Sequence, residues 1–144
     1  MKKYLLLLLF AGMANAQIIT IPDANFKARL LTSSTSNFVA YGNGGYIKID
    51  DNNDGEIQLS EAQAVDSLEI PNANIIDLTG IADFSNLKKL NCSSNQLNNL
   101  NVNSLTQLKK FFCLGNQLTS LDVSNLTNLE WFDCSENQIS TLGM

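Results

Sequence analysis

Hydrophobic positions in the second half of the chain recur at every 21st position. Rows that start at Leu87, Leu108 and Leu129 read LKKLNCSSNQLNNLNVNSLTQ, LKKFFCLGNQLTSLDVSNLTN and LEWFDCSENQISTLGM. The first two rows are identical at 11 of 21 positions. A period of about 20 to 29 residues with leucine, cysteine and asparagine at these spacings predicts a coil in which each turn adds one short strand to a parallel sheet.

Alternation within each row separates the two faces of the predicted strand, because successive side chains of a strand point to opposite sides. The inward positions are Leu90, Cys92, Phe111, Cys113, Phe132 and Cys134. Three residues after each cysteine stands an asparagine, at Asn95, Asn116 and Asn137. An asparagine there can satisfy backbone groups of the neighbouring turns as the chain leaves the sheet. We therefore expect an asparagine ladder.

The remaining apolar positions of each row predict the other corners of the coil. They are Leu97, Leu100, Leu105, Leu118, Leu121, Leu126, Ile139 and Leu142. Because so short a row leaves little room for a helix, extended or 3₁₀ segments are expected on the convex side. An imperfect first turn stands 22 positions upstream, at Leu68, Ile70, Ile75 and Leu78, so the repeats are expected over residues 67–144. The last row stops after 16 of 21 positions, which is consistent with a fragment of a longer array.

Residues 17–66 carry a different pattern and are predicted to cap the first turn. Asp23 follows a proline and precedes apolar Phe26, Leu30 and Leu31 at helical spacing, which predicts a helix over 23–31. A second, short helix is expected over 59–64. Stacked repeats expose their core at each end, so a cap is physically required.

A calcium-type loop lies between the two predicted helices. Residues 50–61 read DDNNDGEIQLSE and match the twelve-residue pattern D-x-[DN]-x-[DN]-G-x₅-E of an EF-hand-like loop. Calcium prefers about seven hard oxygen ligands. The predicted ligands are Asp50, Asn52, Asp54, the Glu56 carbonyl, Gln58 and a bidentate Glu61. The alternative is a metal-free turn at 52–55, since all four residue types favour one. A structural calcium ion is expected rather than a calcium switch, because residues 41–49 do not have the pattern of an entering helix.

Residues 1–16 have the pattern of an export signal. Lys2 and Lys3 precede the apolar run 5–10, and the small-residue site 14–16 follows, so cleavage would leave Gln17 as the first residue. The apolar run is much shorter than the roughly 20 residues of a bilayer-spanning helix, so membrane insertion is not expected. These features predict a secreted or cell-surface protein, with the periplasm as the other possible location.

Composition narrows the function classes. The chain has no histidine, which excludes Ser/His/Asp and Cys/His triads and the commonest catalytic zinc sites. Loss of Lys2 and Lys3 takes the formal charge from −5 to −7, which disfavours nucleic acid and anionic membranes as partners. The three cysteines recur at equivalent inward positions, where neighbouring parallel side chains have poor bridging geometry, so unbridged buried thiols are expected. The sequence predicts a protein that is not an enzyme.

The outward strand positions are the candidate contact surface. They are Lys89, Asn91, Ser93, Lys110, Phe112, Leu114, Trp131, Asp133 and Ser135. Phe112, Leu114 and Trp131 are expected to face solvent, bordered by Lys89, Lys110 and Asp133. Exposed apolar side chains with a charged border are typical of a contact site. The alternative is that later turns or self-association cover them.

Together the segment IPDANFKARLL, the loop DDNNDGEIQLSEA and the repeats resemble secreted bacterial leucine-rich-repeat proteins of the internalin-like group. The resemblance implies an α/β solenoid, a right-handed coil with a parallel concave sheet and a small helical cap related to the calcium-binding hand. It also implies that the concave face binds a partner, a protein or a glycan. The alternative function is a passive structural repeat of the cell surface or matrix without a dedicated ligand.

Overall fold

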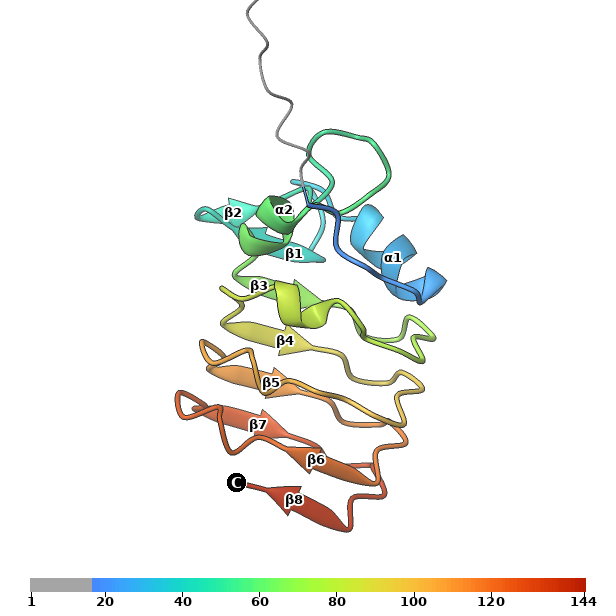
Figure 1. Ribbon diagram of the computed structural model, residues 1–144, viewed down its shortest axis with the longest axis vertical. Coiled ribbons are helices and arrows are strands. Elements are labelled where there is room, and N and C mark those ends of the chain that lie inside the picture. The colour runs from blue at the N-terminus through green and yellow to red at the C-terminus, as the bar shows by residue number, and fades with distance from the viewer. Residues whose placement is uncertain (1–16) are drawn as a thin grey trace, which may run out of the picture.

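The computed structural model describes residues 17–144, and the predicted export signal lies outside them. The chain forms a β-solenoid whose coils each add one parallel strand to a six-stranded sheet (Figure 1). The parallel strands are β3 (Ser67–Glu69), β4 (Lys89–Asn91), β5 (Lys110–Phe112) and β7 (Trp131–Asp133). The solenoid predicted from the period of the rows is therefore confirmed.

The strand register reproduces the predicted alignment of the rows. Leu90 lies beside Phe111, which lies beside Phe132, and Leu68 of the imperfect first turn lies beside Leu90. The side chains of Leu68, Leu90 and Phe111 are fully buried. Phe132 is only partly buried because no further coil covers it among the described residues. The core thus runs continuously through the coils and becomes more accessible in the last one.

The asparagine ladder forms as predicted. Asn95 Oδ1 accepts hydrogen bonds from the N–H groups of Ala73 and Ile75 in the preceding coil, at 3.0 and 3.1 Å. Its Nδ2 donates to the carbonyls of Ile70 and Cys92, at 3.0 and 2.9 Å. Asn116 and Asn137 repeat this arrangement one and two coils later. Each asparagine therefore satisfies polar backbone groups inside the coil that no ladder strand reaches.

The convex side carries no α-helix in the described part of the chain, so the expected α/β solenoid is better called a β-solenoid. The first turn has a single 3₁₀ helix, η1 (Ile81–Asp83). Later turns are extended, and β6 (Ser120–Asp122) pairs with β8 (Thr141–Gly143) in a second parallel sheet. Leu121 and Leu142 pair in this sheet, as their equivalent places in successive rows predict, although Leu142 is 40% exposed.

Two helices and a hairpin lie at the N-terminal end of the solenoid (Figure 1). They are α1 (Ala24–Leu31), α2 (Leu59–Gln63), β1 (Ala40–Gly42) and β2 (Gly45–Tyr46). Strand β1 pairs antiparallel with both β2 and β3, so the hairpin extends the solenoid sheet by two strands. None of the helices described over 17–144 is long and apolar enough to cross a membrane.

Asp23 joins α1 to the first coil. One carboxylate oxygen accepts from the Phe26 N–H at 2.8 Å and caps the helix, as the predicted helix start requires. The other oxygen accepts from the N–H groups of Ile76 and Asp77, at 2.9 and 3.1 Å. Although burial favours the neutral acid, these N–H donors together hold the pKa of the Asp23 carboxyl below its ordinary value. The carboxylate therefore fastens the helix to the repeats.

The cysteines are unbridged, as predicted from their equivalent positions. Cys92 and Cys113 directly follow Asn91 and Phe112, which are paired residues of neighbouring strands. Both are buried. Cys134 is only half-buried, because it lies in the last described coil. The prediction of three fully buried thiols is thus correct for two of them.

Candidate functional site

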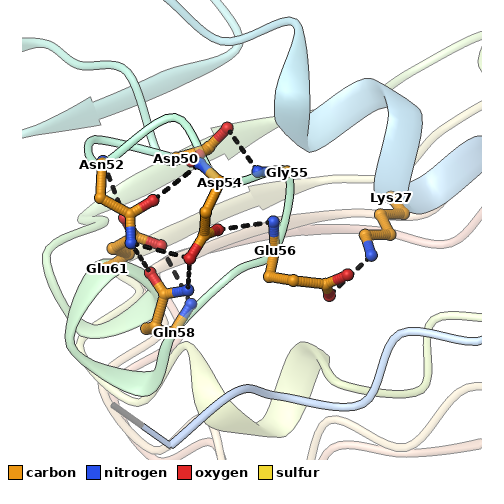
Figure 2. Close-up of polar contacts among 8 residues, drawn as sticks. All are labelled: Lys27, Asp50, Asn52, Asp54, Gly55, Glu56, Gln58 and Glu61. Carbon is orange, nitrogen blue, oxygen red and sulfur yellow. Dashed lines mark hydrogen bonds and ion pairs between the residues drawn. The ribbon is translucent and has the colours of Figure 1, made fainter. Parts of the chain in front are cut away.

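The loop over residues 50–61 is wound by hydrogen bonds from its own backbone to its acidic and amide side chains (Figure 2). The Asp50 carboxylate accepts from the N–H groups of Asp54 and Gly55, at 3.1 and 3.4 Å. Asn52 Oδ1 accepts from Asp54 N–H at 2.9 Å, and Asp54 Oδ1 accepts from Glu56 N–H at 2.8 Å. These contacts hold the side chains of Asp50, Asn52 and Asp54 toward the inside of the loop.

Gly55 permits this winding. Its φ is +78°, in the left-handed region that favours glycine. The neighbouring Ile57 is buried in the core with 1% of its surface exposed, and its carbonyl accepts from the N–H of Ile19 at 2.9 Å. The loop is therefore anchored to the protein on one side and open to solvent on the other.

The amide groups of Asn52 and Gln58 donate hydrogen bonds to the Asp54 carboxylate on the open side of the loop (Figure 2). Asp54 Oδ2 accepts from Asn52 Nδ2 at 3.0 Å and from Gln58 Nε2 at 2.9 Å. Asn52 Nδ2 also donates to Gln58 Oε1 at 3.0 Å. The hydrogen bond from the Glu56 N–H, followed by those from the two amides, lowers the pKa of the Asp54 carboxyl. Partial positive charges thus lie where a cation would contact the same carboxylate.

Glu61 is turned toward the backbone of the loop. Its Oε1 accepts from Asp51 N–H and its Oε2 from Gln58 N–H, both at 2.9 Å, and the second contact is half of a capping box at the start of α2. Within the described part of the chain, no three His, Cys, Asp or Glu side chains gather into a group that could hold a metal. Hydrogen bonds hold Asp50, Asn52, Asp54 and Gln58 close together. Glu61 instead binds one backbone N–H group near the start of the loop and another near its end.

Glu56 links the loop to α1. Lys27 Nζ lies 2.7 Å from Glu56 Oε2, and both side chains are partly exposed. The Glu56 side chain therefore points away from the loop (Figure 2), which leaves its carbonyl as the group available to a cation, as the twelve-residue pattern expects. The donor set consists of hard oxygens in the right order along the chain. For these oxygens to meet at one point, Asn52, Gln58 and Glu61 would have to leave the hydrogen bonds that they form within the loop.

The outer face of the solenoid sheet, meaning the side away from the core, carries the predicted contact residues in rows. Lys89, Lys110 and Trp131 pair directly across β4, β5 and β7. Asn91, Phe112 and Asp133 form the next row, and Leu114 follows β5 on the same side. The structure thus brings all the predicted partner-contacting residues onto one face.

Exposure increases along the row from Lys89 to Trp131. Trp131 is 62% exposed, and Lys110 Nζ lies 5.9 Å from the centre of its ring, within range of a cation–π contact. Phe112 and Leu114 are half-buried rather than fully exposed, because neighbouring strands flank them. The Ser135 hydroxyl and, to a smaller extent, the Ser135 N–H donate hydrogen bonds that lower the pKa of the Asp133 carboxyl. These contacts keep this edge negatively charged.

This face extends beyond the residues predicted from the repeats. The row of Lys89 continues through Ser67 of β3 to Tyr41 of β1 and Tyr46 of β2. Leu68 of the first turn precedes Leu90 by 22 positions. The same offset from Lys89 and Asn91 leads to Ser67 and Glu69, so these two residues could have been predicted. No periodic signal identifies the two tyrosines, because they belong to an antiparallel hairpin outside the repeats.

The three cysteine thiols are poorly suited to nucleophilic chemistry. Burial raises the pKa of the Cys92 thiol to about 12, and burial also raises the pKa values of Cys113 and Cys134. These thiols are therefore protonated at neutral pH and are poor nucleophiles. The sequence offers no histidine to activate them. The exposed side chains of the sheet are aromatic, basic, acidic and amide groups, which are the components of a recognition surface.

No family model matches the chain, and no curated protein matches it. Solved structures are similar. The functional domain of InlJ from Listeria monocytogenes, described as including a cysteine ladder, has a TM-score of 0.65 and 24% identity over 88% of this chain and 29% of that one. The internalin InlF from Listeria monocytogenes has a TM-score of 0.56 and 20% identity over 86% of this chain and 36% of that one. The chain thus spans about a third of the length of these structures, which share its β-solenoid fold.

Proposed function

We propose that the protein is an extracellular recognition module that binds a protein or a glycan on the outer face of its sheet. The observation that carries the proposal is the row from Lys89 to Trp131, in which a largely exposed tryptophan and two lysines lie side by side. Large aromatic side chains beside charged ones are the usual anchors of interfaces. The internalin-like fold supports this role, as does the export-type pattern of residues 1–16, from which we infer secretion or display at the cell surface.

Capture of extracellular proteins and glycans on the immobilised protein tests this function. Trp131→Ala is expected to reduce retention of a specific partner about tenfold or more, since truncating an aromatic anchor commonly costs about 2 kcal/mol or more. Ile76→Ala is the matched control, because Ile76 is 60% exposed, close to the 62% of Trp131, and lies outside the sheet. Sedimentation of both variants separates partner binding from self-association through Trp131.

Equal retention by the parent and Trp131→Ala would contradict a partner site on this face. Retention of nothing by the parent would instead favour the passive structural repeat. Loss of a dimer in Trp131→Ala would assign the exposed surface to self-association.

We further propose that the loop over 50–61 holds a structural calcium ion that stabilises the N-terminal segment against the repeats. The oxygens of Asp50, Asn52, Asp54, Gln58 and Glu61, with the Glu56 carbonyl, supply the hard ligands. Calcium would supply positive charge that replaces the amide donors beside Asp54. The winding of the loop backbone supports the proposal, since the Asp50 carboxylate accepts hydrogen bonds from the N–H groups of Asp54 and Gly55.

Calcium is expected to raise the melting temperature of the protein. Ligand linkage predicts a stabilisation of about 2.7 kcal/mol at a hundredfold excess over the dissociation constant. Asp50→Ala should abolish the response. Asp51→Ala is the matched control, because Asp51 is an exposed neighbour whose side chain is not among the proposed ligands. Differential scanning calorimetry in calcium and in chelator measures both, and an identical response of the parent and Asp50→Ala would refute the site.

A further inference from the structure

Three aromatic side chains gather at the N-terminal edge of the sheet. Phe38, Tyr41 and Tyr46 are 72%, 38% and 40% exposed. The ring of Tyr46 meets the ring of Phe38 edge-to-face, with centroids 5.0 Å apart and an interplanar angle of 89°, and meets that of Tyr41 at 5.6 Å and 85°. Mutual edge-to-face contact holds the rings in place while their outer surfaces stay open to solvent.

The strand register places this aromatic cluster on the outer face of the sheet. Tyr46 pairs with Tyr41, Tyr41 with Ser67, and Ser67 with Lys89, so the four side chains form one row across β2, β1, β3 and β4. Beside this row lies a hollow of about 610 Å³, lined by the aromatic cluster together with polar and charged side chains. A hollow of this size lies within the range of small-ligand sites.

The charged groups of the hollow differ in whether they have an ion-pair or hydrogen-bond partner. Lys89 forms an ion pair with Glu69, whose other carboxylate oxygen accepts from Asn91 Nδ2 at 2.8 Å. Arg29, from the last turn of α1, also lines the hollow. Its Nε is buried without a hydrogen-bond partner, and none of the ion pairs among residues 17–144 includes Arg29. A ligand cannot reach the buried Nε, but a ligand carboxylate could pair with the terminal nitrogens of the same guanidinium, which lines the hollow.

We propose that this hollow binds a saccharide that carries a carboxylate, such as a hexuronic acid residue. The apolar face of a sugar ring would lie against Tyr41 and Tyr46, its hydroxyls would meet Ser67 and Glu69, and its carboxylate would accept from Arg29. A guanidinium matches a carboxylate in geometry and charge. A cationic ligand is disfavoured, because Arg29 and Lys89 together exceed the single negative charge of Glu69.

The saccharide site gives the proposed recognition function a ligand class. It rests on that function only because both sites lie on the outer face of the sheet. The saccharide site occupies the β1–β2 end of the face, whereas Trp131 lies at the β7 end. The two ends can therefore be tested separately.

Isothermal titration of the full chain with trimers of galacturonic and mannuronic acid tests the site, with neutral galactose and mannose trimers as matched probes. At least one acidic trimer is expected to bind about tenfold or more tightly than its neutral counterpart, and high salt should weaken that advantage. Tyr41→Ala is expected to weaken binding of the acidic trimer about tenfold. Arg29→Gln should remove the preference for the acidic trimer, and Ile76→Ala, at an exposed residue outside the sheet, should leave saccharide binding unchanged.

Tyr41→Phe keeps the ring and is expected to keep most of the affinity, which separates loss of the aromatic surface from a folding defect. Circular dichroism of each variant checks that it is folded. Absence of binding by all acidic trimers would overturn the inference, as would equal affinity for acidic and neutral trimers. Binding lost in Trp131→Ala but retained in Tyr41→Ala would place the saccharide at the β7 end and would refute this site without refuting the recognition function.

Discussion

Phe111→Ala is expected to lower the free energy of unfolding by about 3 to 5 kcal/mol, the usual loss when a buried phenylalanine is truncated. Phe111 is fully buried, and its ring stacks on that of Phe132 with centroids 5.6 Å apart and an interplanar angle of 20°. The cavity would lie in the middle of the core, between Leu90 and Phe132, where neighbouring coils hold the strands in place. Little of it can therefore be filled by relaxation.

Phe112→Ala is the matched control, since it removes the same side chain from the next residue of the same strand. Phe112 is half-buried on the outer face, so its loss is expected to cost about 1 kcal/mol, roughly half the value of burying a phenylalanine completely. Urea unfolding followed by far-UV circular dichroism compares the two variants. Equal destabilisation would show that the strand register is wrong. A larger loss of unfolding free energy for Phe112→Ala would show that the inward and outward faces are the reverse of those described.

Asn116→Leu is expected to lower the free energy of unfolding by about 3 kcal/mol or more, because each buried polar group left unpaired costs about 1 to 3 kcal/mol. Asn116 Oδ1 accepts from the Leu97 N–H at 3.1 Å, and its Nδ2 donates to the carbonyls of Cys92 and Cys113 at 3.1 and 3.0 Å. Leucine has nearly the same size but no polar atoms. These backbone groups would therefore stay buried without partners.

Asn128→Leu controls for the loss of an asparagine that also bridges two coils. Asn128 Nδ2 donates to the Thr106 carbonyl at 2.8 Å, but it does so at the surface, where water can replace it. Its loss is expected to stay within about 0.5 kcal/mol, as for most surface substitutions. Thermal unfolding of both variants gives the comparison. Asn137→Leu should fall between them, because Asn137 is half-buried in the last described coil. Similar melting temperatures for the Asn116 and Asn128 variants would show that the ladder does not stabilise the coil.

The repeats could be predicted from the sequence because their structure follows from local rules that are applied several times. One period of the rows specifies the strand, the face that Leu90 and Phe111 point to, and the asparagine that follows. Stacking of identical coils then requires that equivalent positions lie side by side, so the register of Leu90 with Phe111 follows directly. The same logic predicts the row that contains Lys110 and Trp131. It also predicts that the cysteines lie in a line without bridging.

The calcium-type loop could be predicted in its residue order but not in its side-chain arrangement. Spacing alone indicates that Asp50, Asn52 and Asp54 lie in one loop, and the structure places them there. Spacing does not reveal that the amides of Asn52 and Gln58 donate to Asp54, or that Glu61 accepts from the backbone. Those hydrogen bonds depend on which donors come within reach of each carboxylate once the loop closes, and the order of residues does not specify this.

The sequence by itself thus determined the solenoid, its register, its asparagine ladder and two rows of its outer face, one of which contains Lys89, Lys110 and Trp131. Only the tertiary structure decided that the β1–β2 hairpin joins the sheet, which adds Tyr41 and Tyr46 to that row and opens the hollow beside Arg29. It also decided that Asp23, which caps α1 as its place in the sequence predicts, binds the N–H groups of Ile76 and Asp77, which lie far along the chain in the first coil. The physical reason is that repeated local patterns predict contacts between equivalent positions. Single contacts between distant, dissimilar segments depend on the complete packing of the chain.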